Sequence, residues 1–432
     1  MVYNHLGPDG NYLKAFSSAY FTNRYPCEWG EAVNFDGEDA EAVREFFLSN
    51  AGYWIEEFHF DGLRLDATHA IYDSSDHHIL KEISRTVREK AKGRSTIVVA
   101  EDEQQHAFKA MPPESGGYGL DGLWNDDFHH SALVAVTGHN SAYYTDYLGT
   151  PQEFISALKR GYLFQGQQCR WQKKRRGTPA YAVNPASFII YLENHDQVAN
   201  SGRGLRCHAL AGLGTYRAIT ALLLLAPNTP MLFQGQEFAS SSPFLYFADH
   251  KPELNELVQK GRFEFVSRFL NLASDDVHAY LDKPGNRETF EKSQLDFSER
   301  NKNKHIYTMH RDLIRLRRED PVIGRQLKGG VDGAVLTSNA FVIRYFDPAG
   351  RDRLLSVNLG RDVHFDPAPQ PLLAPPVHAQ WHVLWSSEDP RYGGSGTPLP
   401  DAEEGWRIPG QAAVLLYPAE QETARCLNFR LP

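Results

Sequence analysis

The sequence has little cysteine, no excess of positive charge and no long apolar run. Its four cysteines in 432 residues show no C-x-x-C spacing, which excludes the common paired-cysteine zinc and redox motifs and favours a reduced, cytoplasmic setting. Acidic residues outnumber lysine and arginine by 54 to 45, and the net charge of −9 argues against a nucleic-acid partner or an anionic membrane surface. The longest apolar run, residues 221–226, is far shorter than the roughly 18 residues of a membrane-spanning helix, so we expect no membrane partner.

Three short apolar stretches each lead into a carboxylate. They occupy residues 60–65, 96–100 and 188–192, and their composition predicts buried β-strands. The acids that follow them are Asp66, Glu101 and Asp196. Because the carboxyl ends of parallel strands in a barrel meet on one face, the sequence predicts that these acids gather in a single active site.

Arg64 and Asp66 are two residues apart, so on a strand their side chains point the same way. A guanidinium beside a carboxyl keeps it ionised, which suits a nucleophile better than a proton donor. Structural ion pairs of this kind are also common in buried strands, so the pair alone leaves both interpretations open. The other two acidic strand ends favour the catalytic interpretation.

The segments around these acids resemble conserved regions II, III and IV of the α-amylase superfamily of glycoside hydrolases, and residues 2–5 resemble the end of region I. The resemblance implies an α/β fold, a (β/α)8-type TIM barrel followed by a small C-terminal antiparallel β-sandwich domain. In the family, region I opens with an aspartate that would precede Met1. We therefore expect the chain to begin inside the third barrel strand and to lack the first two βα units.

The order of elements along the chain fits that architecture. Residues 1–323 are expected to form the incomplete catalytic barrel, with a loop insertion at about 6–37, and residues 324–432 the β-sandwich domain. The last barrel strand is expected at 230–237. Apolar periodicity predicts helices at 43–58, 79–91, 216–226 and 303–319. The short joints between strands and helices indicate parallel strands.

The resemblance implies a retaining mechanism in which Asp66 is the nucleophile, Glu101 the acid and base, and Asp196 the stabiliser of the transition state. Other residues match family positions that line the sugar, or can hydrogen-bond to it or stack on it. These predicted substrate-binding residues are His5, Arg64, His69, Trp124, Asn125, Asp126, Asp127, Phe128, His195, Gln197 and Asn200. No cofactor is expected.

A metal site is not expected either. Two histidines follow Phe128 beside two acids, but their spacing lacks an H-E-x-x-H pattern or a cysteine partner. Asn4 corresponds to a calcium ligand in some superfamily members, yet no other nearby residues build an oxygen cage.

Further segments, among them residues 243–250 and 288–296, are similar to those of the malto-oligosyltrehalose trehalohydrolases. This resemblance implies hydrolysis of the α-1,4 bond next to a terminal trehalose unit, with malto-oligosyltrehalose or a related α-glucan as the partner. Two alternatives stay open. The chain could be a glucan branching enzyme, which has the same acids but transfers to a sugar hydroxyl, or an inactive fragment that only binds glucan.

Overall fold

The computed structural model describes residues 1–432 except 8, 28, 270–280, 403–404 and 421–432. The chain forms two compact units. Unit 1 comprises Met1–Asp126 and Arg160–Ile189, and unit 2 comprises Asp127–Lys159 and Ile190–Pro432. The predicted domain boundary between 323 and 324 stays a prediction, and the end of that predicted C-terminal domain, 421–432, lies outside the described residues. Within the described part of the chain, no helix combines the length and the apolar character needed to cross a membrane.

A parallel sheet runs through unit 1 with the strand order β3-β4-β5-β8. Its strands are β3 (Gly62–Leu65), β4 (Ile97–Ala100), β5 (Gly122–Trp124) and β8 (Phe188–Ile190), the last residue of which belongs to unit 2. A Cβ at Gly62 would lie 1.9 Å from the carbonyl oxygen of Ile97, so this close pairing requires glycine. The parallel order brings the carboxyl ends of β3, β4 and β5 to the same edge, and it confirms the parallel strands predicted from the sequence.

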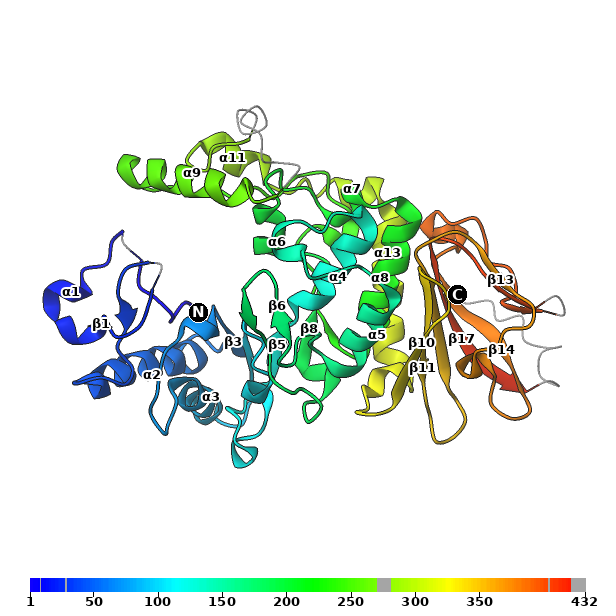
Figure 1. Ribbon diagram of the computed structural model, residues 1–432, viewed down its shortest axis with the longest axis horizontal. Helices are drawn as coiled ribbons and strands as arrows, with labels where there is room; N and C mark the ends of the chain where they lie inside the picture. Colours follow the sequence, from blue (N-terminus) through cyan, green and yellow to red (C-terminus); the bar gives the residue numbers. More distant parts are fainter. Residues whose placement is uncertain (8, 28, 270–280, 403–404, 421–432) are drawn as a thin grey trace. The chain divides into compact units, whose positions relative to one another are not determined.

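Two amphipathic helices, α2 (Ala40–Glu56) and α3 (Ile79–Lys90), pack side by side in unit 1 (Figure 1). Both lie close to their predicted spans. Their apolar faces and the strands share one buried cluster that includes Val43, Phe47, Ile55, Ile83, Val87, Leu63, Leu65, Val98 and Leu123. Because strand side chains alternate, Leu63 and Leu65 point into this core, and Arg64 points to the other side of the sheet.

The remaining elements of unit 1 are short. Residues 6–37 hold α1 (Leu13–Phe16) and a two-stranded antiparallel sheet of β1 (Phe21–Thr22) and β2 (Ala32–Val33). A second small hairpin joins β6 (Gln168–Cys169) to β7 (Lys174–Arg175).

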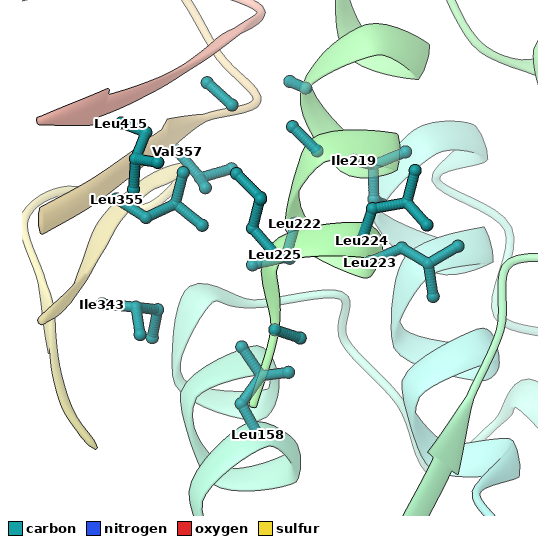
Figure 2. Packing of buried hydrophobic residues seen from close by; sticks show 14 of the residues in the cluster. Leu158, Ile219, Leu222, Leu223, Leu224, Leu225, Ile343, Leu355, Val357 and Leu415 are labelled. Carbon is teal, nitrogen blue, oxygen red and sulfur yellow. The ribbon is translucent and has the colours of Figure 1, made fainter. Parts of the chain in front are cut away.

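Helix α8 (Leu213–Leu225) is buried in unit 2 from Thr215 onward and is apolar on nearly all sides, as expected of a buried helix. Figure 2 shows Leu222 and Leu225 of this helix facing strand residues Leu355 and Val357. Leu158 of α5 (Pro151–Arg160) belongs to the same cluster. Among the described residues, the other α-helices of this part of the chain are α4 (Asp126–Thr137), α6 (His195–Asn200), α7 (Cys207–Leu210), α9 (Pro252–Val266), α11 (Arg287–Lys292), α12 (Glu299–Lys302) and α13 (Lys304–Glu319).

A five-stranded antiparallel sheet of order β10-β11-β12-β17-β14 follows α13 in the chain. Along β11, Phe341 and Ile343 join the α8 cluster, whereas Val342 between them packs with Trp381 and Trp406 on the opposite face. Trp406 comes from a second, three-stranded sheet of order β13-β16-β15. The bounds are β10 (Val331–Val335), β11 (Ala340–Tyr345), β12 (Arg353–Asn358), β13 (Val363–Phe365), β14 (Ala379–Ser386), β15 (Asp401–Ala402), β16 (Gly405–Ile408) and β17 (Ala412–Glu420).

The strand predicted at 230–237 is much shorter than expected. Only β9 (Thr229–Pro230) is extended and paired, and the chain then turns into a short 3-10 segment, Gln236–Phe238. The side-chain oxygen of the buried Gln236 accepts a hydrogen bond of 3.2 Å from the N–H of Phe233. This local bond closes a turn that competes with continued strand pairing.

Candidate active site

Asp66 lies directly after strand β3, and its carboxylate is bound from two sides. Arg64 Nη1 donates to Asp66 Oδ1, and Asn4 Nδ2 donates to Asp66 Oδ2 at 2.9 Å and to the Asp66 carbonyl at 3.0 Å. Burial alone would raise the pKa of Asp66, but the charge of Arg64 and the hydrogen bonds to the carboxylate outweigh it, and the pKa lies below its usual value. Asp66 is therefore ionised at neutral pH, as a nucleophile must be.

Glu101 follows β4, the neighbour of β3 in the sheet. Its Oε2 lies 2.9 Å from Arg64 Nη2 and accepts a hydrogen bond of 3.0 Å from the backbone N–H of Ala67. Ala67 has a φ of 39°, a left-handed conformation that alanine rarely adopts. One guanidinium thus contacts the carboxylates of both Asp66 and Glu101.

Arg64 is itself positioned by Trp124 at the end of β5. The guanidinium carbon of Arg64 lies 4.2 Å from the centroid of the indole ring, a close cation–π contact. The carbonyl of Trp124 accepts a hydrogen bond of 3.1 Å from the hydroxyl of Tyr162. Three adjacent parallel strands therefore contribute to one cluster of Arg64, Asp66, Glu101 and Trp124, which is the candidate active site of unit 1.

Two predicted histidines also lie in unit 1. His5 Nδ1 is hydrogen-bonded to Asn4 Oδ1, and the ring of His5 stacks on Trp29 with centroids 5.2 Å apart and an interplanar angle of 18°. His69 Nδ1 accepts a hydrogen bond of 3.3 Å from the N–H of Glu103, and its Nε2 lies 3.6 Å from Glu103 Oε2. Burial lowers the pKa of His69, which favours a neutral ring at neutral pH.

The stretch that follows β5 is largely buried. Asn125 is fully buried, and its Nδ2 donates to a backbone carbonyl at 3.0 Å. Asp126 is the first residue of α4, Asp127 is fully buried and accepts a hydrogen bond from a tyrosine hydroxyl, and Phe128 packs in the core of unit 2. The assignment of these four residues to substrate binding stays a prediction.

Helix α6 in unit 2 carries the remaining predicted residues. Asn194 caps the helix, since its Oδ1 accepts a hydrogen bond of 2.7 Å from the N–H of Gln197. His195 Nε2 lies 3.2 Å from Asp196 Oδ2, and the side chain of Asp196 is 46% exposed. The grouping of Asp196 with the two acids of unit 1 stays a prediction.

Gln197 and Asn200 lie further along the same helix. Gln197 Oε1 accepts a hydrogen bond of 3.2 Å from the hydroxyl of Tyr143, and Asn200 Oδ1 accepts one from Arg262. These contacts attach α6 to neighbouring parts of unit 2, and the proposed contact of both residues with substrate stays a prediction.

Two residues that support the candidate site are absent from the site predicted from the sequence. Asn4 corresponds in sequence to a possible calcium ligand, whereas its amide holds Asp66. Its place next to His5, in the segment that resembles the end of region I, was a usable signal. Lys109 is buried and contacts the residues around Glu101. No motif or periodicity marks it in the sequence.

Comparison with known proteins identifies relatives over most of the chain. Residues 328–406 match a family model described as "Domain of unknown function (DUF3459)". The malto-oligosyltrehalose trehalohydrolase of Deinococcus radiodurans is 39% identical over 373 residues, 84% of this chain and 58% of that protein. The trehalohydrolase of Saccharolobus solfataricus is 36% identical over 74% of this chain and 53% of its own length. A 1,4-alpha-glucan branching enzyme of Leifsonia xyli is 27% identical over 50% of this chain and 28% of that enzyme.

The chain thus spans little more than half the length of the trehalohydrolases that it matches. Among solved structures, an alpha-amylase-like protein from Salmonella typhimurium is similar with a TM-score of 0.80 and 28% identity, over 96% of this chain and 67% of that chain. Over the part of these proteins that it spans, the chain is similar to the α-amylase superfamily of glycoside hydrolases. Within that superfamily its similarity to the malto-oligosyltrehalose trehalohydrolases is higher and longer than its similarity to the branching enzyme.

Proposed function

We propose that the chain carries the catalytic carboxylates of a retaining glycoside hydrolase that cleaves the α-1,4-glucosidic bond next to the terminal trehalose of malto-oligosyltrehalose. Trehalose and a shortened malto-oligosaccharide are the products. The observation that carries this proposal is the contact of one guanidinium, that of Arg64, with both Asp66 and Glu101. The substrate class comes from the named relatives.

In the proposed reaction Asp66 attacks the anomeric carbon, the bond from that carbon to the leaving oxygen breaks, and Glu101 gives its proton to that oxygen. Glu101 then takes a proton from water, whose oxygen displaces Asp66 and restores the original anomeric configuration. A retaining enzyme needs its two carboxyl groups about 5–5.5 Å apart, whereas an inverting enzyme needs about 6.5–9.5 Å. The shared guanidinium supports the shorter separation.

Asp196 is assigned the third role, in which it grips sugar hydroxyls and stabilises the oxocarbenium-like transition state. Its support is its place on the short segment after β8, a strand that pairs in parallel with β5. Two predicted substrate-binding residues of unit 1 are assigned to orient the reacting sugar. They are Arg64, which contacts both acids, and Trp124, which stacks on Arg64.

We assign the strands β3, β4, β5 and β8 to a (β/α)8-type barrel that residues 1–3 enter in its third strand. The backbone of Met1 supports this assignment, because its nitrogen donates to the carbonyl of Arg64 and its carbonyl accepts from the N–H of Asp66. We assign the two antiparallel sheets of the C-terminal part to a β-sandwich. The shared cluster of Val342, Trp381 and Trp406 supports that arrangement.

Purified chain incubated with malto-oligosyltrehalose is expected to release free trehalose in amounts that grow linearly with enzyme concentration. The measurement is chromatography of the products against trehalose and malto-oligosaccharide standards. Release of maltose without trehalose would contradict the proposed specificity.

A branching enzyme would instead leave the glucan total unchanged and create new α-1,6 branch points, which debranching and chain-length analysis would detect. The shorter and weaker match to the branching enzyme makes this the second candidate. An inactive glucan-binding fragment would retain malto-oligosyltrehalose on a binding assay and release no product.

Replacing Arg64 with methionine is expected to move the acidic limb of the kcat/KM profile to higher pH. In the wild type, the pKa of Asp66 lies below its usual value of 3.8, so the nucleophile is lost only as the pH falls through that lowered value. Without the guanidinium, burial raises the pKa of Asp66, and the limb should shift upward by about one pH unit or more. Arg85→Met on the exposed face of α3 is the matched control, and its profile should overlay the wild type.

A further inference from the structure

A buried lysine lies behind the ends of strands β3 and β4. Lys109 is 4% exposed, and its Nζ lies 3.0 Å from Asp102 Oδ2. The same Nζ donates to the carbonyl and to the hydroxyl oxygen of Thr68, both at 3.2 Å. A buried ammonium group is tolerated only when it is paired in this way, so these contacts fix the side chain of Lys109.

Both partners of Lys109 are directly connected to Glu101. Asp102 is the next residue in the chain. Thr68 donates twice to the carbonyl of Glu101, from its N–H and from its hydroxyl, each at 2.8 Å. Because the hydroxyl proton of Thr68 is used there, its oxygen is available to accept from Lys109.

The position of the Glu101 carboxylate is fixed in part by Ala67, the residue before Thr68. Ala67 donates its N–H to Glu101 Oε2 at 3.0 Å while it holds a left-handed φ of 39°. A non-glycine residue keeps such a conformation only when its surroundings enforce it. The bonds of Thr68 to Lys109 and to Glu101 supply that enforcement, immediately after the strained residue.

The side chain of Asp102 is also fixed by several contacts. Its carboxylate also accepts hydrogen bonds from the N–H of Gln104 at 3.2 Å and from the N–H of His106 at 3.1 Å. Burial alone would raise the pKa of Asp102, but Lys109 and His106 outweigh it and hold the pKa well below its usual value. Asp102 therefore remains an anion that Lys109 can bind across the neutral pH range.

We propose that Lys109, Asp102 and Thr68 form a buried positioning triad that sets the carboxyl group of Glu101 for proton transfer to the leaving oxygen. The proposal rests on the proposed glycosidase function. None of the three residues is assigned a contact with substrate, so they act through Glu101. A purely structural ion pair would affect stability alone, whereas a positioning triad also affects the one step that needs the proton of Glu101.

The test uses Lys109→Met in the full chain with two substrates. Malto-oligosyltrehalose has a poor leaving group that needs protonation, whereas α-maltosyl fluoride has a leaving group that departs with little help. Because general acid catalysis contributes about 10²- to 10⁴-fold, kcat/KM for malto-oligosyltrehalose should fall about 10-fold or more beyond the fall for the fluoride. Equal falls for both substrates would overturn the proposal.

Arg44→Met is the matched control, because Arg44 lies 2.6 Å from the fully buried carboxylate of Asp73 in the same unit. It removes a cation from a comparable pair and should lower both kcat/KM values equally. If Lys109→Met does not fold, the double variant Asp102→Asn with Lys109→Met replaces it, since it leaves no unpaired charge buried, and it is judged by the same ratio.

A crystal structure of the folded variant separates this proposal from the proposed function. Loss of the hydrogen bond between Ala67 N–H and Glu101 is the expected result, and an unchanged Glu101 side chain would overturn the triad. If the wild type cleaves neither substrate, the proposed glycosidase function fails, and the crystallographic comparison decides the positioning of Glu101 by itself.

Discussion

Replacing Asp66 with asparagine is expected to lower kcat/KM for malto-oligosyltrehalose by roughly 10⁴-fold or more, the size of loss seen when a covalent nucleophile is removed. The amide has the same shape, and its single oxygen can still accept from Arg64, but its NH2 group replaces the oxygen that accepts from Asn4. It also has no charge with which to attack the anomeric carbon. The measurement is initial-rate kinetics of trehalose release, together with thermal unfolding to show that the variant is folded.

Asp61→Asn is the matched control for this variant. Asp61 lies just before β3, and its side chain is 89% exposed, 3.6 Å from Arg94. The same chemical change there should leave kcat/KM within about twofold of the wild type, because a single exposed ion pair contributes little. An Asp66→Asn variant that kept wild-type turnover would remove Asp66 from the mechanism.

Replacing Glu101 with glutamine should impair the cleavage of a substrate that needs a proton donor and leave the attack on a substrate that needs none nearly unchanged. Loss of the general acid is expected to lower kcat/KM for malto-oligosyltrehalose by about 10²- to 10⁴-fold, while attack on α-maltosyl fluoride stays near the wild-type rate. The glycosyl-enzyme then accumulates, because no base activates water. Mass spectrometry of the denatured protein should detect the added sugar on the peptide that contains Asp66.

Added azide gives this second prediction a sharper readout. Azide needs no base, so it should attack the glycosyl-enzyme of the Glu101→Gln variant, restore turnover and yield an α-glycosyl azide. Glu103→Gln is the control, since Glu103 is two residues away with a side chain that is 49% exposed, and it should need no azide. A β-glycosyl azide from the Glu101 variant would contradict the retaining mechanism.

The sequence predicted the framework of the candidate site well, because strand ends are local features. Apolar runs interrupted by an acid placed Asp66 and Glu101 after β3 and β4, and the two-residue spacing of Arg64 and Asp66 predicted their ion pair. Helix spans were also close, since α3 and α13 carry strong apolar periodicity. These features depend on neighbours in the sequence, which a single chain displays directly.

The sequence could not predict contacts that join distant residues without a repeating pattern. Lys109 reaches Thr68 across 41 positions, and Asn4 reaches Asp66 across 62. The left-handed conformation of Ala67 carries no signal, because the residue is not glycine and surrounding bonds enforce its φ. The prediction of a long strand at 230–237 was wrong because the side chain of Gln236 accepts a hydrogen bond from the N–H of Phe233 and closes a turn there.

Helix α8 and the C-terminal sheet share one interior within unit 2. Leu222 and Leu225 pack with strand residues Leu355 and Val357, and the hydroxyl of Tyr345 donates to the carbonyl of Leu225. Residues 328–406, which match a domain family of their own, therefore close over a helix that lies outside that stretch. Separating the two would expose the apolar face of the helix and that of the sheet to water. The helix and the sheet should therefore unfold together, and neither should be stable in another protein without redesign of its exposed face.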